Sequence, residues 1–566
     1  MRLRETQLVL PLYILASVAF TWPLALAFSR AIPSGRVAFD PCMQAFILGW
    51  DWHSIRSNLL GVFHAPIFYP EPNTLTYMDH LLGETLATLP VLALTGSIAA
   101  AYNLLFIGSF AASAWTTYRL VRLLGVSRFG AFLAGSLFAF SPYRCANLDL
   151  LNQLQTQFLP LGLLFGVRYL RRYRARDLIG IAGTFVVQVY FGWYYAYYLA
   201  LALAVLVLYS VATDGLELRN IRWAHAAGVA LCAALIVLPV SLPYAWEHRA
   251  LPEFRRSLGE SALYSADVLD YLAWNRNALL AKWMPFAAGP QSYWPGLATV
   301  LLAAAGAWKM RSPARRWGRE GYFLVLSAVS FVLSLGPILH VAHVRVWIPL
   351  PYAALYYILP GVSNMRAPAR LASLALLGLV VLAGLGWDRL RRGRIGRLRG
   401  DSRLLSGALL LIAIASAWPR PLSVVELPSP RRMPPVYAWL AGEPGAGPIL
   451  EVPLPARDAD ESETHALRQY CALFHGRPRL DGTSGFVSRR YREFRLVAQS
   501  FPDDRSLSAA AAMGARQIIV HFGDFAPEQR AALRLKIEAQ RRLKPVARFN
   551  ADAVYQLDAN AGSPSS

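Results

Sequence analysis

The chain has 566 residues, of which 55% are hydrophobic and 16% are charged. Soluble domains seldom reach this apolar fraction, and repeated runs of about 20 apolar residues are the usual mark of transmembrane helices. The net charge is +22, but the basic residues fall in short clusters between apolar runs. This pattern argues against a nucleic-acid-binding surface and favours topology signals at a membrane.

Eleven apolar runs lie within the first 419 residues, and we predict that each forms a transmembrane helix. The runs are 8–28, 99–118, 129–143, 152–168, 177–192, 194–212, 224–243, 293–308, 321–340, 371–388 and 404–418. The basic segments between them are 119–128, 171–176, 218–222, 309–319 and 389–400. With these segments in the cytoplasm, the positive-inside rule puts the N-terminus inside and everything after residue 419 outside.

The first apolar run follows Arg2 and Arg4 and is longer than the core of a signal peptide. We therefore expect an uncleaved first helix in a multi-pass protein of the plasma membrane.

The segment 29–98 forms a long first external loop in this scheme. Its stretch 44–63 has apolar residues near helical spacing and predicts an amphipathic helix on the membrane surface. Prolines in 65–84 interrupt regular structure and predict an ordered loop. The apolar stretch 82–97 fits the topology only as an interfacial or re-entrant helix, because a crossing would move the arginines of 119–128 outside.

From residue 420 the chain is more charged and lacks long apolar runs. Helical patterns occur at 435–442, 503–515 and 527–542, and strand patterns occur at 448–454, 516–522 and 552–557. This alternation predicts a small extracytoplasmic α/β domain over 420–558. Residues 559–566 have the composition of a disordered tail.

Acidic and imidazole side chains gather in the first external loop, beside the membrane, where ionisable groups are costly unless they are solvated or used. Asp40 opens a predicted helix, so it is a helix cap, a catalytic acid or both. Asp51 and His53 favour a solvated face of that helix over catalysis. Asp79 and His80 are equally consistent with a structural loop and with catalysis.

The next external turn, 141–160, adds polar side chains. Asp149, Asn152 and Gln155 are spaced by three, which predicts one shared helix face. Carboxylate and amide groups there suit sugar hydroxyls, since amides both donate and accept hydrogen bonds. The alternative is a polar stripe between packed helices.

Arginines outside the membrane are harder to explain as topology signals. Arg366 and Arg370 stand four apart before the run 371–388, so we expect them to be neighbours on a helix. Guanidinium groups bind phosphate with a bidentate fork, which favours a lipid phosphate or pyrophosphate as the ligand. Snorkelling to the headgroups is the alternative. The aromatic cluster 191–198 indicates an interfacial belt or a platform that stacks sugars.

These features together resemble the GT-C superfamily of membrane glycosyltransferases, and most closely the family 39-like bacterial members, which include protein mannosyltransferases and lipid A aminoarabinose transferases. The shared organisation is a first helix, a long external loop with an early acidic residue, many further spans and a soluble external C-terminal domain. The motifs "FDPCMQAF", "FYPEPNTLTYMDHLLGE" and "SPYR…NLDLLNQLQTQFLPL" carry the resemblance. It implies a GT-C-like transmembrane domain over 1–419 of about eleven helices.

The resemblance implies inverting transfer from a polyprenyl-phosphate sugar to a glycan, lipid or protein acceptor on the outer face of the inner membrane. Asp40 would be the general base, and Arg366 with Arg370 would stabilise the leaving phosphate. Several family members carry two adjacent acids in the first loop, whereas Pro41 follows Asp40 here. The second carboxylate then comes from elsewhere, and the candidates are Asp79, Glu84 and Asp149.

The sequence indicates no certain cofactor. It contains no glycine loop that cradles a nucleotide, and a divalent metal is compatible with the reaction although no ligand set stands out. Two other classes of function stay open. One is a transporter or flippase for lipid-linked saccharides, which often shows inverted repeats that are not seen here. The other is a non-catalytic membrane scaffold that binds partners through its external domain.

Overall fold

The computed structural model describes residues 3–34, 38–213, 221–274, 278, 292–308, 319–359, 361–392, 412, 418–419, 421–443, 447–455 and 462–558. The apolar run 404–418, apart from residues 412 and 418, and the predicted tail 559–566 lie outside these residues. The chain forms two compact units that are each assembled from separate stretches. Unit 1 comprises Met1–Phe28, Asn103–Ser241 and Arg255–Leu422, and unit 2 comprises Ser29–Tyr102, Leu242–Phe254 and Ser423–Ser566.

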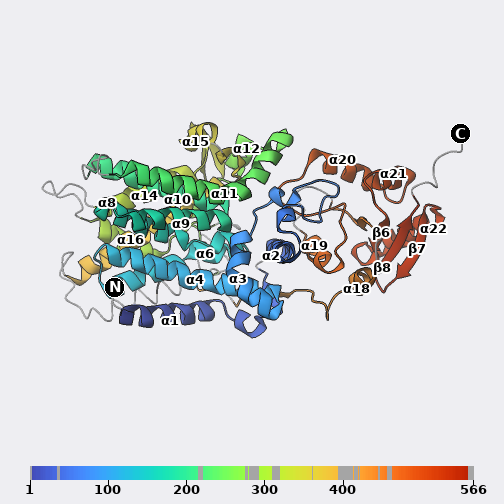
Figure 1. Cartoon of the computed structure of the whole chain (residues 1–566), viewed down its shortest axis with the longest axis horizontal. Helices are drawn as coiled ribbons and strands as arrows, with labels where there is room; N and C mark the ends of the chain where they lie inside the picture. Colours follow the sequence, from blue (N-terminus) through green and yellow to red (C-terminus); the bar gives the residue numbers. More distant parts are fainter. Residues whose placement is uncertain are drawn as a thin grey trace. The chain divides into compact units, whose positions relative to one another are not determined.

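Unit 1 is built mainly of helices that run side by side (Figure 1). In chain order its elements are α1 (Leu3–Phe20), η1 (Leu24–Ala27), α4 (Ile98–Leu123), α5 (Arg128–Ala139), α6 (Pro142–Ala146), α7 (Leu151–Leu154), α8 (Phe158–Arg172), α9 (Ala175–Phe191), α10 (Trp193–Thr213), α11 (Trp223–Ala250), α12 (Leu258–Leu263), η6 (Val268–Tyr271), α13 (Leu297–Ala307), α14 (Arg319–Ser334), β2 (Ile338–Val341), β3 (Val344–Pro349), α15 (Tyr352–Ile358), η8 (Val362–Asn364), η9 (Pro368–Leu371) and α16 (Ala372–Arg391). The helices α4 and α11 also contribute residues to unit 2.

Several of these helices are long and apolar enough to cross a membrane. Four qualify by length and composition, namely Ile98–Leu123, Trp193–Thr213, Trp223–Ala250 and Pro368–Arg391. Shorter apolar helices of 10–17 residues are Leu8–Phe20, Leu82–Thr95, Leu297–Ala307 and Glu320–Ser334. A transmembrane helix needs ~20 residues, and the shorter helices fall below this length. The total of eleven spans therefore stays a prediction.

The helix α16 lies at the centre of unit 1, with nearly all of its apolar side chains buried. Glycines let its neighbours approach closely. A Cβ at Gly306 of α13 would lie 2.0 Å from the carbonyl oxygen of Leu382, and one at Gly386 would lie 1.9 Å from that of Leu302. Small residues of this kind are the usual contact points of helices in membranes.

The predicted run 321–340 is helical only as far as Ser334. Gly336 has a φ of +75°, which a helix does not accommodate, and Pro337 follows it. The chain then forms the hairpin of β2 and β3. The run is therefore a shorter helix followed by an antiparallel hairpin.

Unit 2 joins the segment 29–102 to the C-terminal segment. Its elements are β1 (Ala31–Pro33), α2 (Phe39–Ser57), η2 (Leu59–Gly61), η3 (Thr74–Tyr77), α3 (Leu82–Thr95), η5 (Pro252–Phe254), β4 (Val424–Glu426), α18 (Pro435–Gly442), β5 (Ile449–Val452), α19 (Glu463–His475), α20 (Arg489–Ala498), α21 (Asp504–Ala512), β6 (Gln517–His521), η10 (Phe522–Asp524), α22 (Pro527–Ala539), β7 (Leu543–Arg548) and β8 (Asp552–Leu557). The strand β1 pairs with β4, and α2 packs against α3 and α19. The helix predicted over 44–63 therefore begins and ends earlier, as α2, and a helix from the other end of the sequence covers part of it. Its position on the membrane surface stays a prediction.

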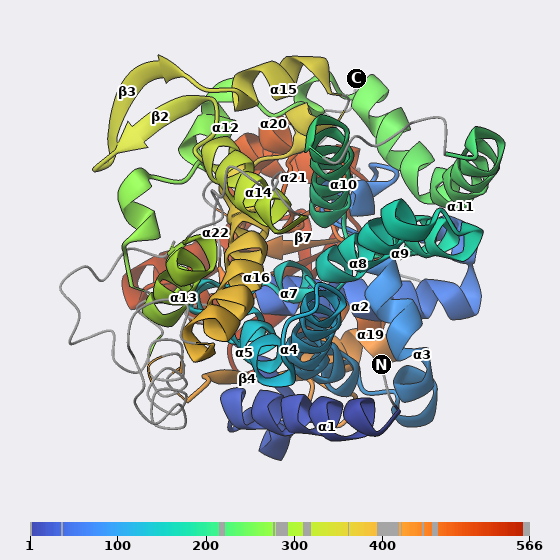
Figure 2. The same ribbon diagram turned by 90° about the vertical axis from the view of Figure 1, so that its left-hand side faces the viewer.

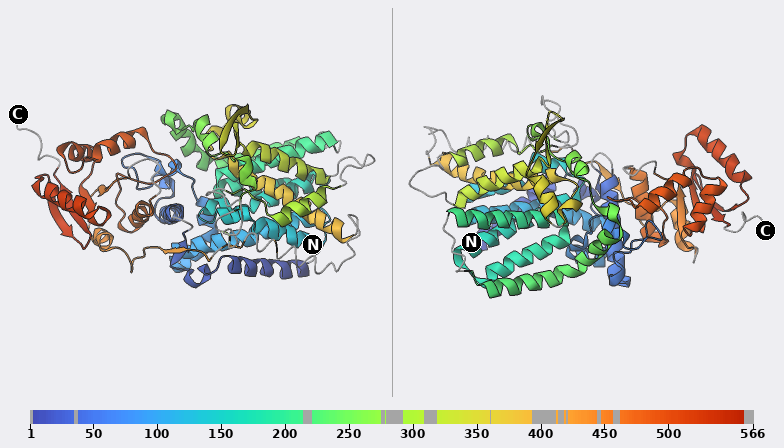
Figure 3. Two further views of the ribbon diagram at one scale, coloured as in Figure 1. Left: turned by 180° about the vertical axis from the view of Figure 1, so that it is seen from behind. Right: turned by 90° about the horizontal axis from the view of Figure 1, so that it is seen from above.

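The C-terminal segment contains a four-stranded mixed sheet with the order β5-β6-β8-β7 (Figure 3). The strands β5 and β6 are parallel and buried along their whole length, as expected for strands covered on both faces. The outer strand β7 carries Lys544, Pro545 and Arg548, which are typical of a protected edge. The predicted α18, β5, α21, β6, α22 and β8 are confirmed, while the sequence patterns do not predict α19, α20 or β7.

Candidate functional site

Asp40 lies in the first turn of α2 and is half-buried. Ala38 is the N-cap residue, so the interpretation of Asp40 as the cap is wrong. The backbone N–H of Ala38 donates to the carboxylate of Glu463, in the first turn of α19, at 3.3 Å. A second carboxylate therefore lies at the start of α2, where a helix N-terminus favours negative charge. Sequence reasoning missed Glu463 because 425 residues separate it from Ala38.

Asp51 lies on the buried face of α2 and is 0% exposed, so the prediction of a solvated position is wrong for Asp51 and correct for the exposed His53. The Thr85 hydroxyl donates to Asp51 Oδ2 at 3.1 Å. Oδ1 has no hydrogen-bond partner among the described residues. Burial raises the pKa of Asp51 to about 8, because the apolar surroundings disfavour its charge. The carboxyl group is therefore neutral at pH 7.

Asp51, Asp79 and Glu84 form an acidic cluster, because both aspartates lie within electrostatic reach of Glu84. Glu84 is fully buried in the first turn of α3, and neither of its carboxylate oxygens has a hydrogen-bond partner in the described part of the chain. A buried carboxylate without donors favours its neutral form. Asp79 is half-buried and is the carboxylate of this cluster that stays accessible.

His80 is fully buried beside the acidic cluster. Its backbone N–H donates to the Tyr244 hydroxyl at 3.2 Å, and that hydroxyl donates to the Met78 carbonyl at 2.9 Å. The ring stands edge-on to Phe63, with the ring centres 6.4 Å apart. Burial lowers the pKa of His80 to about 3, so the imidazole is neutral at physiological pH. Tyr244 of α11 thus fixes the loop that carries Asp79 and His80, a role that the sequence did not reveal.

In unit 1, Arg366 and Arg370 come together through tyrosines. The Arg366 guanidinium lies over the Tyr264 ring at 4.3 Å, and its backbone N–H donates to the Tyr194 hydroxyl at 2.8 Å. The Arg370 guanidinium lies over the Tyr194 ring at 4.4 Å. We call Tyr194, Tyr264, Arg366 and Arg370 the tyrosine–arginine cluster. Arg366 makes no ion pair within the described residues, and both arginines are half-buried.

The two arginines are not neighbours on one helix, as their spacing had suggested. Arg366 precedes η9, whereas Arg370 lies within it, because Pro368 starts a new turn. The aromatic segment 191–198 supplies their partner. Its Tyr195 and Tyr198 are buried, so the prediction of an interfacial belt is wrong for these two tyrosines.

Asp149, Asn152 and Gln155 do not share a helix face. The helix α7 spans only Leu151–Leu154, so Asp149 and Gln155 lie outside it on either side. Gln155 is buried and accepts a hydrogen bond from the Gln157 side chain at 3.0 Å. Asp149 and Asn152 are half-buried.

Arg144 of α6 is a buried cation close to this turn. Its guanidinium donates to the hydroxyls of Ser109 at 3.1 Å and Ser113 at 3.2 Å, and also to that of Thr156. It lies over the Phe110 ring at 4.6 Å. Within the residues that the structure covers, no carboxylate pairs with it. Hydroxyls and a ring thus compensate a buried positive charge, which is an uncommon arrangement.

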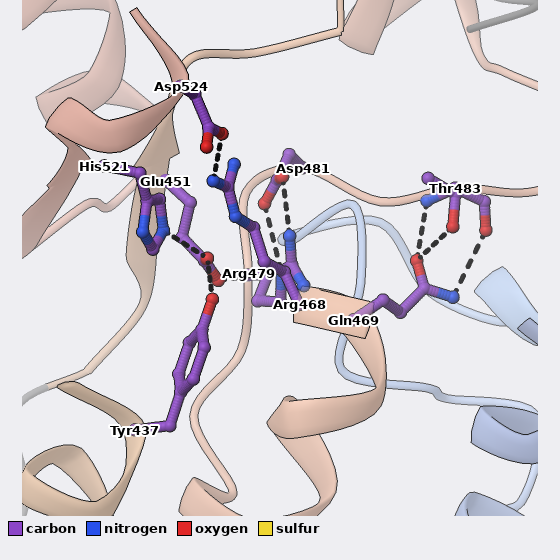
Figure 4. Close-up of polar contacts among 9 residues, drawn as sticks. All are labelled: Tyr437, Glu451, Arg468, Gln469, Arg479, Asp481, Thr483, His521 and Asp524. Carbon is purple, nitrogen blue, oxygen red and sulfur yellow. Dashed lines mark hydrogen bonds and ion pairs between the residues drawn. The ribbon is translucent and has the colours of Figure 1, made fainter. Parts of the chain in front are cut away.

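The sheet of unit 2 contains a separate buried polar network, which Figure 4 shows. The carboxylate of Glu451 on β5 accepts from the Tyr437 hydroxyl at 2.6 Å and pairs with Arg479 at 3.3 Å and His521 Nε2 at 3.0 Å. Arg479 also pairs with Asp481 at 2.7 Å. Burial opposes the charge on Glu451, but Arg479 and His521 outweigh it and hold the pKa of this carboxyl well below its usual range.

The same network holds the loops around β5 and β6 in place. Arg468 of α19 pairs with Asp524, and the Gln469 side chain binds Thr483 through its backbone and its hydroxyl. Most of these polar groups satisfy one another, so the network stabilises the C-terminal sheet. No three His, Cys, Asp or Glu side chains in the described residues could hold a metal ion, here or in the acidic cluster.

Asp40, Asp79, His80 and Glu84 belong to unit 2, whereas Asp149, Asn152, Gln155, Arg366 and Arg370 belong to unit 1. The structure thus brings Asp79, His80 and Glu84 together in one unit and Arg366 and Arg370 together in the other.

Neither a protein-family model nor a curated protein sequence matches this chain. Solved structures match it over nearly its whole length. Arabinofuranosyltransferase AftD from Mycobacteria has a TM-score of 0.59 at 15% identity, and the match covers 99% of this chain and 40% of AftD. Archaeal oligosaccharyltransferase AglB from Archaeoglobus fulgidus, solved with an inhibitory peptide and a dolichol-phosphate, has a TM-score of 0.52 at 12% identity, with 100% and 75% covered.

At these identities the similarity shows the fold. The chain has a fold similar to that of GT-C membrane glycosyltransferases, as the resemblance of its sequence implied. It spans less than half the length of AftD.

Proposed function

We propose that this chain is a family 39-like membrane glycosyltransferase. It moves a sugar, with inversion, from a polyprenyl-phosphate-linked donor to a lipid, glycan or protein acceptor on the outer face of the membrane. The fold that it shares with AftD and AglB supports this class of enzyme. AglB was solved with a dolichol-phosphate, and a donor on a lipid phosphate of that kind suits the proposal.

The observation that carries the proposal is the tyrosine–arginine cluster. Arg366 keeps a half-buried guanidinium over Tyr264 and makes no ion pair in the described part of the chain. Its backbone is fixed by Tyr194, the same ring that Arg370 covers. Two guanidinium groups that are oriented by tyrosine rings suit a phosphate ligand, since their planar forks bind its oxygens.

In the proposed reaction, Asp40 takes the proton from the acceptor hydroxyl. The oxygen attacks the anomeric carbon from the face opposite the phosphate, and the bond between that carbon and the phosphate oxygen breaks. The electron pair goes to the lipid phosphate, and Arg366 and Arg370 stabilise the growing negative charge. The products are the glycosylated acceptor and a polyprenyl phosphate.

The remaining candidates have supporting roles in this proposal. Asp79 is the accessible carboxylate of the acidic cluster and is the alternative base, and the neutral His80 positions the loop that carries it. Glu84, Asp149, Asn152 and Gln155 bind substrate hydroxyls. The enzyme is a multi-pass protein of the bacterial inner membrane with about eleven spans, a cytoplasmic N-terminus and an extracytoplasmic C-terminal domain.

The test is transfer of labelled sugar by the purified full chain in nanodiscs. The donors are a mixture of polyprenyl-phosphate sugars, and the acceptors are extracted from cell envelopes. We expect transfer by the wild type, loss of turnover in Asp40→Asn, and an increase in the donor KM in Arg366→Gln. Glu528→Gln, at an exposed position of α22, is the matched control for removal of a carboxylate.

Equal turnover in wild type and Asp40→Asn would remove Asp40 from the mechanism and make Asp79 the next base to test. A folded wild type that moves labelled lipid-linked saccharide across vesicles without transferring its sugar would establish the flippase alternative. A chain that does neither but retains partners through its C-terminal sheet would be a scaffold.

A further inference from the structure

The hairpin of β2 and β3, together with α15, exposes apolar side chains that no described residue of unit 1 covers. Trp347 is 79% exposed, Val344 63%, Tyr357 75% and Ile358 72%. Figure 2 shows the hairpin as a two-stranded ribbon that projects from the helices of unit 1, with α15 beside it. Exposed apolar patches of this kind mark a surface that is covered in the working protein.

The two strands of the hairpin alone do not bury enough apolar surface to be stable in water. It has two strands, and every residue of β3 except Val346 is exposed. An isolated pair of strands is at best marginally stable without an apolar layer to pack on. Leu339 and Leu350, which are partly buried, pack against the core of unit 1.

The composition of the segment identifies the covering partner. Residues 338–359 contain no Asp or Glu, but they contain Arg345 together with His340 and His343. They also contain Trp347 and Tyr357 at exposed positions. Exposed aromatic and basic side chains without acids are the usual composition of a segment at the interface of a bilayer, where the rings lie at headgroup level and the cations meet lipid phosphates.

The segment is continuous with membrane-spanning candidates. The apolar helix α14 ends at Ser334, four residues before β2 begins at Ile338, and the candidate span Pro368–Arg391 follows α15. The sequence assigns 341–370 to the outer side. A hairpin between two apolar helices therefore stays near the membrane surface.

The tip of the hairpin is held rigidly. Its two-residue turn consists of Ala342 and His343, with φ values of +52° and +62°, a conformation that favours glycine or asparagine. The buried carboxylate of Asp267 accepts from both backbone N–H groups, at 3.1 Å and 2.7 Å. A single carboxylate thus fixes an unfavourable turn and with it the direction in which Val344 and Trp347 point.

We propose that the β2–β3 hairpin and α15 form an interfacial anchor that inserts its apolar side chains into the outer leaflet of the bilayer. This anchor is distinct from the transmembrane helices, since it enters one leaflet only. It also leads directly into η8 and η9, and so it fixes the depth of Arg366 and Arg370 at the level of lipid phosphates. The anchor requires that the chain lies in a membrane, but it does not require that the chain transfers a sugar.

The test uses a fluorophore on Trp347→Cys in the full chain, reconstituted in nanodiscs that contain phosphatidylglycerol. Cys232 is exposed and is replaced by Ser, whereas the other three cysteines are buried. We expect quenching by lipids with a doxyl group near the headgroup, and several-fold less quenching by aqueous iodide than for a label at Leu535→Cys, an exposed position of α22. Leu235→Cys, on the exposed face of α11, is the membrane-embedded reference.

Iodide quenching equal to that at Leu535, without doxyl quenching, would overturn the proposal, because the hairpin would then lie in water. Val344→Cys is the second label, so that damage caused by replacing one aromatic ring cannot decide the outcome. Glycosyl transfer needs no measurement here, so failure of the anchor and failure of the proposed enzyme activity are distinguishable.

Discussion

Replacement of Asp51 by Asn tests whether the buried carboxyl group on α2 keeps its proton near neutral pH. The side chain is 0% exposed, and burial raises its pKa from 3.8 to about 8. Between these two values the folded chain holds a proton that the unfolded chain has released. The free energy of unfolding therefore falls by ~1.4 kcal/mol for each pH unit, so this group contributes most stability at low pH and loses it as the pH rises towards 8.

From pH 5 to pH 7 the loss amounts to roughly 3 kcal/mol for the wild type. Asp51→Asn is uncharged, has nearly the same shape and still accepts from Thr85, so its stability should lack this slope. The assay is thermal unfolding of the purified chain in detergent at several pH values, with Glu528→Gln as the exposed control. Parallel pH profiles for wild type and Asp51→Asn would refute the reasoning, since Asp51 would then be ionised and solvated.

Substitutions at Glu451, Tyr194 and Gly306 test three other features. Glu451→Gln should destabilise the chain by roughly 3–5 kcal/mol in denaturant unfolding, because it leaves buried cations without their anion. The raised pKa of His521 means that the stability contributed by its charge is present below the unfolded pKa of 6.5 and is lost as the pH rises through the folded value, whereas the lowered pKa of Glu451 means that its contribution is lost at acid pH. Tyr194→Phe should raise the donor KM modestly, and Tyr194→Leu more strongly, because only Leu also removes the ring worth about 0.5–2 kcal/mol under the Arg370 guanidinium. Gly306→Ala should lower the melting temperature, because its Cβ would lie 2.0 Å from a backbone oxygen, while Gly183→Ala, with open space around it, should not.

Each of these has a contrary outcome. An unchanged denaturant midpoint of unfolding in Glu451→Gln would mean that water, and not Glu451, compensates the charges of Arg479 and His521. Equal donor KM values for the two Tyr194 variants would show that the aromatic ring does not contribute to donor binding. Equal melting temperatures for Gly306→Ala and Gly183→Ala would show that α13 and α16 are less tightly packed than their backbones indicate.

The sequence by itself determined the mostly helical fold class and most of the elements. Apolar runs and their spacing are local properties, so the helices of the membrane part and six elements of the C-terminal segment follow from them. The resemblance to GT-C enzymes also rests on the order of such segments, and the fold agrees with it. The residue types that suit the chemistry, such as Asp40 and Arg366, are likewise visible in the chain.

Only the tertiary structure decided what surrounds those residues. Burial depends on which helix faces meet, and the sequence does not show that α3, with Thr85, packs against the face of α2 that carries Asp51. Glu463 reaches the start of α2 across 425 residues, and Tyr194 connects Arg366 and Arg370 from a distant helix. A local pattern records the period of a helix, but it carries no information about the partner that the helix will meet, and the pKa and pairing of a side chain depend on that partner.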